Sequence, residues 1–192
     1  MFWNKQQGVL RPEFQRILLR AARDSIEGGL LTGMPIEVRL SDYPPELRSN
    51  RAAFVTLEIE GELRGCVGTI KAHRPLIEDV IHNAFASAFM DSRFPKLAQQ
   101  ECGRLEISIS LLSDLEALLF DSESDAAAKL RPGIDGLMIE QAAFRGTYLP
   151  SMWETVPDPG EFLKGVKVKA GLPRDYWSAS LKLWRFTAET FS

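Results

Sequence analysis

Two stretches of the chain repeat apolar residues at intervals of three and four, the spacing of a helix that buries one face. The first stretch begins at Pro12, which suits a first helical turn because no N–H donor is needed there. Its apolar positions are Phe14, Ile17, Leu18, Ala21, Ala22 and Ile26. Because glycine favours helix ends, we expect Gly28-Gly29 to end this helix.

The second stretch is the strongest helix prediction in the sequence. It begins at Pro75, and its apolar stripe is formed by Leu76, Val80, Ile81, Ala84, Phe85, Ala88 and Phe89. Pro95 ends the pattern, because proline cannot continue a helix and disfavours helical backbone at the preceding residue. We expect one shared core to bury Phe85 and Phe89 together with Val55, Leu57, Ile107 and Ile109.

Alternating apolar and polar residues predict half-buried strands. Ala53–Ile59 alternates in this way, and Glu60-Gly61 then forms a turn that returns the chain into a second strand. The clearest strand is the stretch 105–111, whose odd-numbered residues are all Leu or Ile. We expect those odd positions to face the core.

The second half of the chain mixes short helices and strands. Two helices are expected, a short one within Asp121–Ala128 and a longer one that is capped by Asp158-Pro159. Strands are expected at Leu137–Glu140 and Gly146–Leu149, and a single last strand at Leu181–Phe191. Two hairpins without a regular strand–helix alternation favour a mixed α+β fold with a largely antiparallel sheet and packed helices.

Composition restricts the class of protein. A chain of 192 residues with 45% hydrophobic and 26% charged residues suits one globular domain, either undivided or with two lobes. A net charge of -3 argues against nucleic-acid binding, which relies on a basic excess. The first eight residues lack the apolar core of a signal peptide, and no apolar run reaches the roughly 18 residues of a membrane span. Two cysteines indicate a reducing compartment, so we expect a cytoplasmic protein without membrane contact.

The stretch Leu63–Thr69 concentrates the chemistry of the chain. It places Arg64, Cys66 and Thr69 beside two glycines, Gly65 and Gly68. On a strand, Arg64 and Cys66 share a face, and a neighbouring cation favours the reactive thiolate. The glycines would leave room for a ligand beside the thiol. The alternative is a thiol that is buried as a small apolar group, which is the commoner fate of a free cysteine.

Leu63-Arg-Gly-Cys-Val-Gly-Thr69 closely resembles the Leu-Arg-Gly-Cys-Ile-Gly-Thr signature of the AMMECR domain family, whose prokaryotic members are called AmmeMemoRadiSam system protein A. Further stretches resemble the family's other landmarks in the family's order: Arg74-Pro-Leu76, Asp91-Ser-Arg-Phe-Pro95, Leu105–Leu111, Arg131–Leu137, Arg145–Pro150 and Ala170–Pro173. The resemblance therefore covers nearly the whole of residues 1–192. It implies a two-lobed domain with Leu63–Thr69 at or near the cleft between the lobes, and a biochemical activity that is unsettled.

Several arginines lie within these landmarks, beside glycine or proline. They are Arg64, Arg74, Arg93, Arg131 and Arg145. Arginine in such a setting suits bidentate capture of a carboxylate or phosphate. The alternative is that each arginine pairs with a nearby Asp or Glu. We predict that Arg74, Arg93 and Arg145 bind a small anionic ligand together with Gly65, Gly68 and Thr69.

Two classes of function follow. In the first, the chain is an accessory or substrate-binding module that works with a radical-SAM protein and a Memo-like protein, as the family name implies. In the second, it is an enzyme with Cys66 as reactive thiol and Arg64 beside it. A clear base is missing, because His73 lies in none of the family landmarks and His82, on a mostly apolar helix, is more often a structural histidine. No motif predicts a metal site or a cofactor, so we expect neither.

Overall fold

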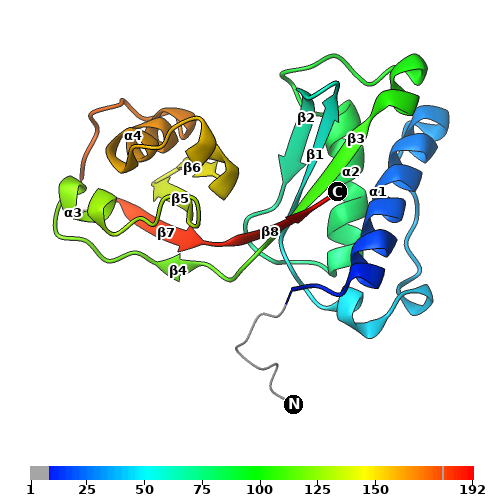
Figure 1. Ribbon diagram of the computed structural model, residues 1–192, viewed down its shortest axis with the longest axis horizontal. Helices are drawn as coiled ribbons and strands as arrows, with labels where there is room; N and C mark the ends of the chain where they lie inside the picture. Colours follow the sequence, from blue (N-terminus) through cyan, green and yellow to red (C-terminus); the bar gives the residue numbers. More distant parts are fainter. Residues whose placement is uncertain (1–8, 179) are drawn as a thin grey trace. The chain divides into compact units, whose positions relative to one another are not determined.

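The computed structural model describes residues 9–178 and 180–192, which form two compact units (Figure 1). The first unit comprises Met1–Leu112 and Glu189–Ser192, and the second comprises Ser113–Ala188. In the sequence, the second unit is therefore inserted between residues 1–112 and the last four residues of the first unit. The N-terminal segment that we expect not to be a signal peptide lies outside the described residues.

Two helices of the first unit pack closely together. They are α1, Pro12–Thr32, and α2, Leu76–Phe89. The prediction that Gly28-Gly29 ends the first helix is wrong: α1 continues to Thr32 and is capped by Gly33, which adopts the left-handed conformation. Gly29 is instead a contact point, because a Cβ there would lie 2.5 Å from the Phe89 ring and 2.8 Å from the Phe85 ring. Tertiary packing explains this glycine, where the sequence pattern alone indicates a helix end.

The sheet of the first unit has the strand order β2-β1-β3-β8. Its strands are β1, Ala53–Ile59, β2, Glu62–Gly68, β3, Glu106–Leu112, and β8, Ala188–Phe191. The predicted β1–β2 hairpin is confirmed. A bulge skips Arg64, because Leu57 pairs with Gly65 whereas Glu58 pairs with Leu63.

Most of the expected core is confirmed in the first unit. Val55, Leu57, Ile107 and Ile109 are all buried. Phe85 and Phe89 are only half-buried, so their predicted burial is wrong. Their ring centres lie 4.9 Å apart, on the side of α2 that faces Gly29 of α1.

The second unit has its own sheet, with the order β4-β7-β5-β6. Its strands are β4, Glu116–Ala117, β5, Gly136–Gln141, β6, Phe144–Tyr148, and β7, Lys182–Phe186. Its helices are α3, Glu123–Ala128, capped by the Ser122 hydroxyl, and α4, Pro159–Lys169, capped by the Asp158 carboxylate. The short 3-10 helices of the chain are η1, Leu40–Asp42, η2, Pro45–Arg48, η3, Gln99–Arg104, and η4, Pro150–Glu154. The predicted α+β class is confirmed, since β1–β2, β1–β3, β4–β7, β5–β6 and β5–β7 all pair antiparallel and the helices pack on the sheets.

The tail of the chain differs from its prediction. Leu181–Phe191 reads as one strand, yet it forms β7 in one sheet and β8 in the other (Figure 1, red). The break falls at Thr187, whose N–H donates to Ser113 Oγ at 2.9 Å and whose carbonyl accepts from the Ser113 N–H at 2.9 Å. Alternation of apolar residues does not reveal such a break, because both strands keep the same period.

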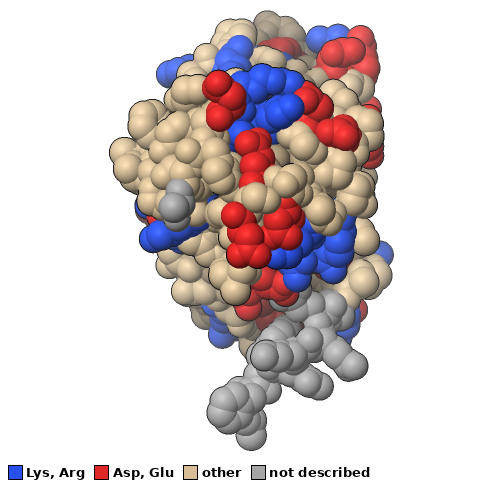
Figure 2. Space-filling view, turned by 90° about the vertical axis from the view of Figure 1, so that its left-hand side faces the viewer, with Lys and Arg blue, Asp and Glu red and all other residues tan. Residues whose placement is uncertain are grey.

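Charges of both signs lie on the surface. On the face shown in Figure 2, Lys and Arg side chains lie beside Asp and Glu side chains, and neither sign dominates that view. Within residues 9–178 and 180–192, no helix is long and apolar enough to cross a membrane.

Candidate functional site

Cys66 lies on β2, the edge strand of the first sheet. It is half-buried, whereas Cys102 is buried at 8% exposure. Its sulfur accepts a hydrogen bond from the Thr56 hydroxyl at 3.4 Å, across the strand pair that these two residues form. Burial raises the pKa of the Cys102 thiol. The two cysteines therefore occupy different environments, and only Cys66 is partly open to solvent.

A loop that follows α2 binds the backbone of Cys66 from the open side of β2. Asp91 Oδ2 accepts from the Cys66 N–H at 2.9 Å, and Arg93 Nη2 donates to the Cys66 carbonyl at 3.2 Å. Arg93 also donates to Asp91 through Nε at 2.9 Å and through Nη2 at 2.6 Å. The guanidinium holds the pKa of the Asp91 carboxyl well below its usual range. The side chains of Asp91 and Arg93 thus hydrogen-bond the N–H and carbonyl of this edge strand, with which a further strand could otherwise pair.

Helix α2 carries a polar stripe beneath the hairpin. Asp79, Asn83 and Ser87 are spaced by four residues and are 1%, 4% and 1% exposed. The Ser87 hydroxyl donates to the Val55 carbonyl at 2.8 Å and accepts from the Val67 N–H at 2.9 Å. Buried polar groups are costly unless they are hydrogen-bonded, and here they connect the helix to both strands of the hairpin.

Asp79 holds the end of the same hairpin. Its Oδ2 accepts from the Ala53 N–H and from Asn83 Nδ2, both at 3.0 Å, and also from the Thr69 hydroxyl. Its Oδ1 lies 3.0 Å from Arg74 Nε, but the angle is not that of a hydrogen bond, and neither atom has another partner within the described chain. Burial raises the pKa of the Asp79 carboxyl.

The two glycines beside Cys66 are places of close approach. A Cβ on Gly65 would lie 2.1 Å from the Ser87 carbonyl oxygen of α2. A Cβ on Gly68 would lie 2.2 Å from the ring of Phe54, its partner on β1. Protein atoms therefore fill the space that these glycines leave, which is a packing reason for both. Their predicted contact with a ligand stays a prediction.

Arg64 is held away from solvent. Its Nε and Nη2 donate to the two carboxylate oxygens of Glu101 at 2.7 and 3.0 Å, and its side chain is 11% exposed. This bidentate pair lowers the pKa of Glu101 to about 2. The guanidinium carbons of Arg64 and Arg93 lie 6.0 and 5.5 Å from the ring centre of Phe94. Phe94 therefore links the arginine of the motif strand to the arginine of the Asp91–Pro95 loop.

The remaining landmark arginines lie in the second unit. Arg145 Nε donates to Glu140 Oε2 at 2.9 Å, across the β5–β6 hairpin. Arg131 donates through its backbone N–H, Nε and Nη2 to the fully buried Asp135. The first unit thus brings together Arg64, Gly65, Cys66, Gly68, Thr69, Arg74 and Arg93, whereas Arg145 belongs to a different unit.

Both histidines are exposed. His73 Nδ1 lies 3.2 Å from the Lys71 carbonyl oxygen, in the loop before α2. The polar contact found at the Cys66 sulfur is the Thr56 hydroxyl, which acts as a donor. Within residues 9–178 and 180–192, no group of three or more His, Cys, Asp or Glu side chains is arranged to hold a metal ion.

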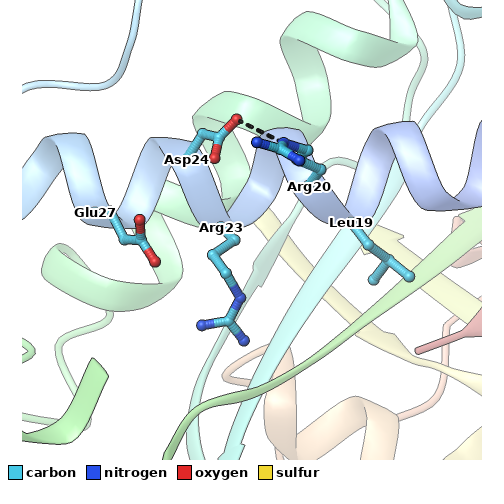
Figure 3. A pocket seen from close by; sticks show the side chains of 5 residues that line it. All are labelled: Leu19, Arg20, Arg23, Asp24 and Glu27. Carbon is cyan, nitrogen blue, oxygen red and sulfur yellow. Dashed lines mark ion pairs between the residues drawn. The ribbon is translucent and has the colours of Figure 1, made fainter. Parts of the chain in front are cut away.

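A separate hollow of about 380 Å³ lies along α1 (Figure 3). It is lined by Leu19, Arg20, Arg23, Asp24 and Glu27. Arg23 Nη2 donates to the Leu105 carbonyl at 2.9 Å, so this side chain connects α1 to the segment before β3. The hollow contains none of the predicted site residues.

Sequence reasoning missed the residues that hold the motif in place. Among them is Asp91, whose carboxylate accepts from the Cys66 N–H. The others are Thr56, Asp79, Asn83, Ser87 and Glu101. A signal for three of them was present, because positions 79, 83 and 87 of the predicted helix are Asp, Asn and Ser at a spacing of four, and Asp91 continues this spacing just beyond the end of α2. A polar stripe at helical spacing on an apolar helix indicates buried hydrogen bonds to a neighbouring element.

Comparison with known proteins shows what this chain is similar to. The AMMECR1 family model matches residues 19–191. A protein of Methanothermobacter thermautotrophicus is 36% identical over 178 residues, which are 92% of each chain. Protein PH0010 of Pyrococcus horikoshii is 37% identical over 189 residues, which cover 95% of this chain and 91% of that protein. The crystal structure of protein PH0010 from Pyrococcus horikoshii, 36% identical in sequence, superposes with a TM-score of 0.87, and the match covers 94% of this chain and 92% of that chain. The chain belongs to the AMMECR1 family.

Proposed function

We propose that this protein is a cytoplasmic accessory or substrate-binding module that works with a radical-SAM protein and a Memo-like protein. The partner classes come from the resemblance of the Leu63–Thr69 motif and the other landmarks to AmmeMemoRadiSam system protein A. The function of such a module is to present a rigid, partly charged surface to a substrate or a partner. It needs no chemistry of its own.

The observation that carries this proposal is the clamp on Cys66. Asp91 and Arg93 bind the two backbone groups of this residue, and Ser87 binds the next N–H. The Arg93 side chain remains 52% exposed, while its partner Asp91 is 6% exposed. The clamp therefore fixes the strand and at the same time presents a guanidinium to solvent. Preorganised charged groups of this kind favour specific binding, because little order is lost on association.

The test is complex formation with purified radical-SAM and Memo-like proteins, measured by size-exclusion chromatography and pull-down. We expect a complex that Arg93→Glu weakens at least tenfold. Arg104→Glu is the matched control, since Arg104 lies in the same unit, is 57% exposed and also forms an ion pair, with Glu60. Absence of any complex of the wild-type chain with either protein contradicts the proposal.

The second candidate is an enzyme that uses Cys66 on a small anionic substrate. The observation in its favour is the Arg93 guanidinium at the Cys66 carbonyl, beside a half-buried thiol. In general, a guanidinium beside a thiol favours the binding of an incoming anion and the reactive form of the thiol. The candidate requires iodoacetamide to label Cys66 at least tenfold faster than Cys102 in the folded protein. Equal and slow labelling of the two cysteines removes its support.

A further inference from the structure

Arg74 and Asp79 form an unusual ion pair at the end of the motif strand. Asp79 is 1% exposed, and one of its oxygens, Oδ2, receives all three hydrogen bonds. The other oxygen, Oδ1, faces Arg74 Nε at 3.0 Å without a hydrogen bond. Charge attraction is therefore what holds Arg74 at this place, while hydrogen bonds hold Asp79 itself.

The charged groups that act on Asp79 are Arg74 and His73, both from the loop before α2. The residues that bind it from the strands, Ala53 and Thr69, are uncharged, as is Asn83 on its own helix. Two of the donors to Oδ2, the Ala53 N–H and Asn83 Nδ2, cannot accept a proton, so we place a proton taken up by Asp79 on Oδ1, the oxygen without a hydrogen bond. A protonated Oδ1 would then point a donor at Arg74 Nε, which is itself a donor and cannot accept.

We infer that Asp79 and Arg74 form a proton-operated switch. With Asp79 ionised, Arg74 stays at the carboxylate. With Asp79 protonated, the attraction is lost, two donors face each other, and Arg74 moves into solvent, to which its side chain is already 27% exposed. The bonds of Oδ2 to Ala53, Thr69 and Asn83 persist in both states, so the hairpin keeps its position while the arginine is released.

Burial supports this inference, because it raises the pKa of Asp79 and moves proton uptake above the range of an ordinary aspartate, about 3.9. Arg93 and Asp91 form the contrasting pair. Arg93 makes true hydrogen bonds to both Asp91 oxygens, and the pKa of Asp91 is lowered. The switch needs no ligand and goes beyond the proposed function, which can fail without affecting it.

The experiment is an NMR titration of the full chain that follows the Asp79 carboxyl carbon and the arginine Nε–H signals. We expect the Asp79 carbon and the Arg74 Nε–H to shift with one shared midpoint above the ordinary aspartate range, while the Arg93 Nε–H stays unchanged in that range. Asp79→Asn should hold the Arg74 signal in its low-pH position at every pH. Separate midpoints, an Arg74 signal that does not move while Asp79 titrates, or an Asp79 midpoint at or below the ordinary range overturns the inference. The wild-type titration decides the matter if Asp79→Asn does not fold.

Discussion

Arginine–carboxylate pairs occur in landmark motifs of both units, but the groups that they bind differ between the two units. In the second unit, Arg131 and Asp135 bind within one turn, and the Asp135 carbonyl accepts from Trp153 Nε1 at 2.6 Å. In the first unit, Arg93 and Asp91 bind the backbone of Cys66, a residue of another motif. The second-unit pair closes a turn of its own segment, whereas the first-unit pair joins two landmarks that are distant in sequence. A landmark arginine therefore does not by itself indicate a ligand site. What distinguishes the two pairs is which other groups the paired carboxylate binds.

The largest effect that we predict tests the close approach in the first unit. Gly65→Ala places a Cβ against the Ser87 carbonyl oxygen, and such overpacking against backbone should cost about 3 kcal/mol of unfolding free energy. Gly103→Ala is the matched control, because a Cβ there has no neighbour within 4 Å, and its cost should stay within about 0.5 kcal/mol. Hydrogen exchange of the β2 amides measures the first unit directly. Equal protection in the two variants contradicts the packing role of Gly65.

The next effect tests the second unit. Asp135→Ala removes a fully buried carboxylate and leaves the Arg131 N–H without its acceptor, which should cost about 2 kcal/mol. Trp153, Trp177 and Trp184 lie in this unit, so urea unfolding followed by tryptophan fluorescence reports on it. Cys66 should keep its wild-type rate of iodoacetamide labelling. A changed rate at Cys66 would show that the pair does more than close its own turn.

A smaller effect concerns acid stability of the first unit. The pKa of Glu101 is lowered to about 2 by the Arg64 guanidinium, so the pair contributes stability that is present above the ordinary value of 4.5 and is lost as the pH falls toward 2. Glu101→Gln should remove this part of the pH profile, with a cost at neutral pH of about 1 kcal/mol after screening by solvent. Glu60→Gln, whose side chain is 76% exposed, serves as the control. The measurement is far-UV circular dichroism against pH, and identical acid profiles of Glu101→Gln and the wild type would falsify the assignment.

The smallest effect tests the charge beside the thiol. Arg93→Gln removes the guanidinium that donates to the Cys66 carbonyl and should slow iodoacetamide labelling of Cys66 about fivefold if this neighbouring charge promotes the reactivity of the thiol. Arg185→Gln is the control, because Arg185 pairs with Glu116 in the second unit. Faster labelling of Arg93→Gln would mean that Arg93 shields the sulfur more than it activates it.

The sequence by itself determined the local elements and the family. The bounds of β1 were predicted without error, and α2 was predicted as the helix that follows Pro75, because apolar periodicity and proline act within a few residues. The seven-residue motif and its companion landmarks identified the AMMECR domain. They also marked Cys66, Arg64, Arg74 and Arg93, all of which lie in the first unit.

Only the tertiary structure decided what surrounds these residues. Gly29 and Gly65 are explained by a second helix and a helix carbonyl, neither of which is near in sequence. The tail divides between two sheets at Thr187 because Ser113 binds its backbone there. The hydrogen bond between Asp91 and the Cys66 N–H becomes evident only in the structure, where α2 packs against the hairpin. The same holds for the contacts of Asp79 with Thr69 and Arg74. The physical reason is that hydrogen bonds and close contacts depend on distances between segments, whereas periodicity reports only which face of a segment is buried.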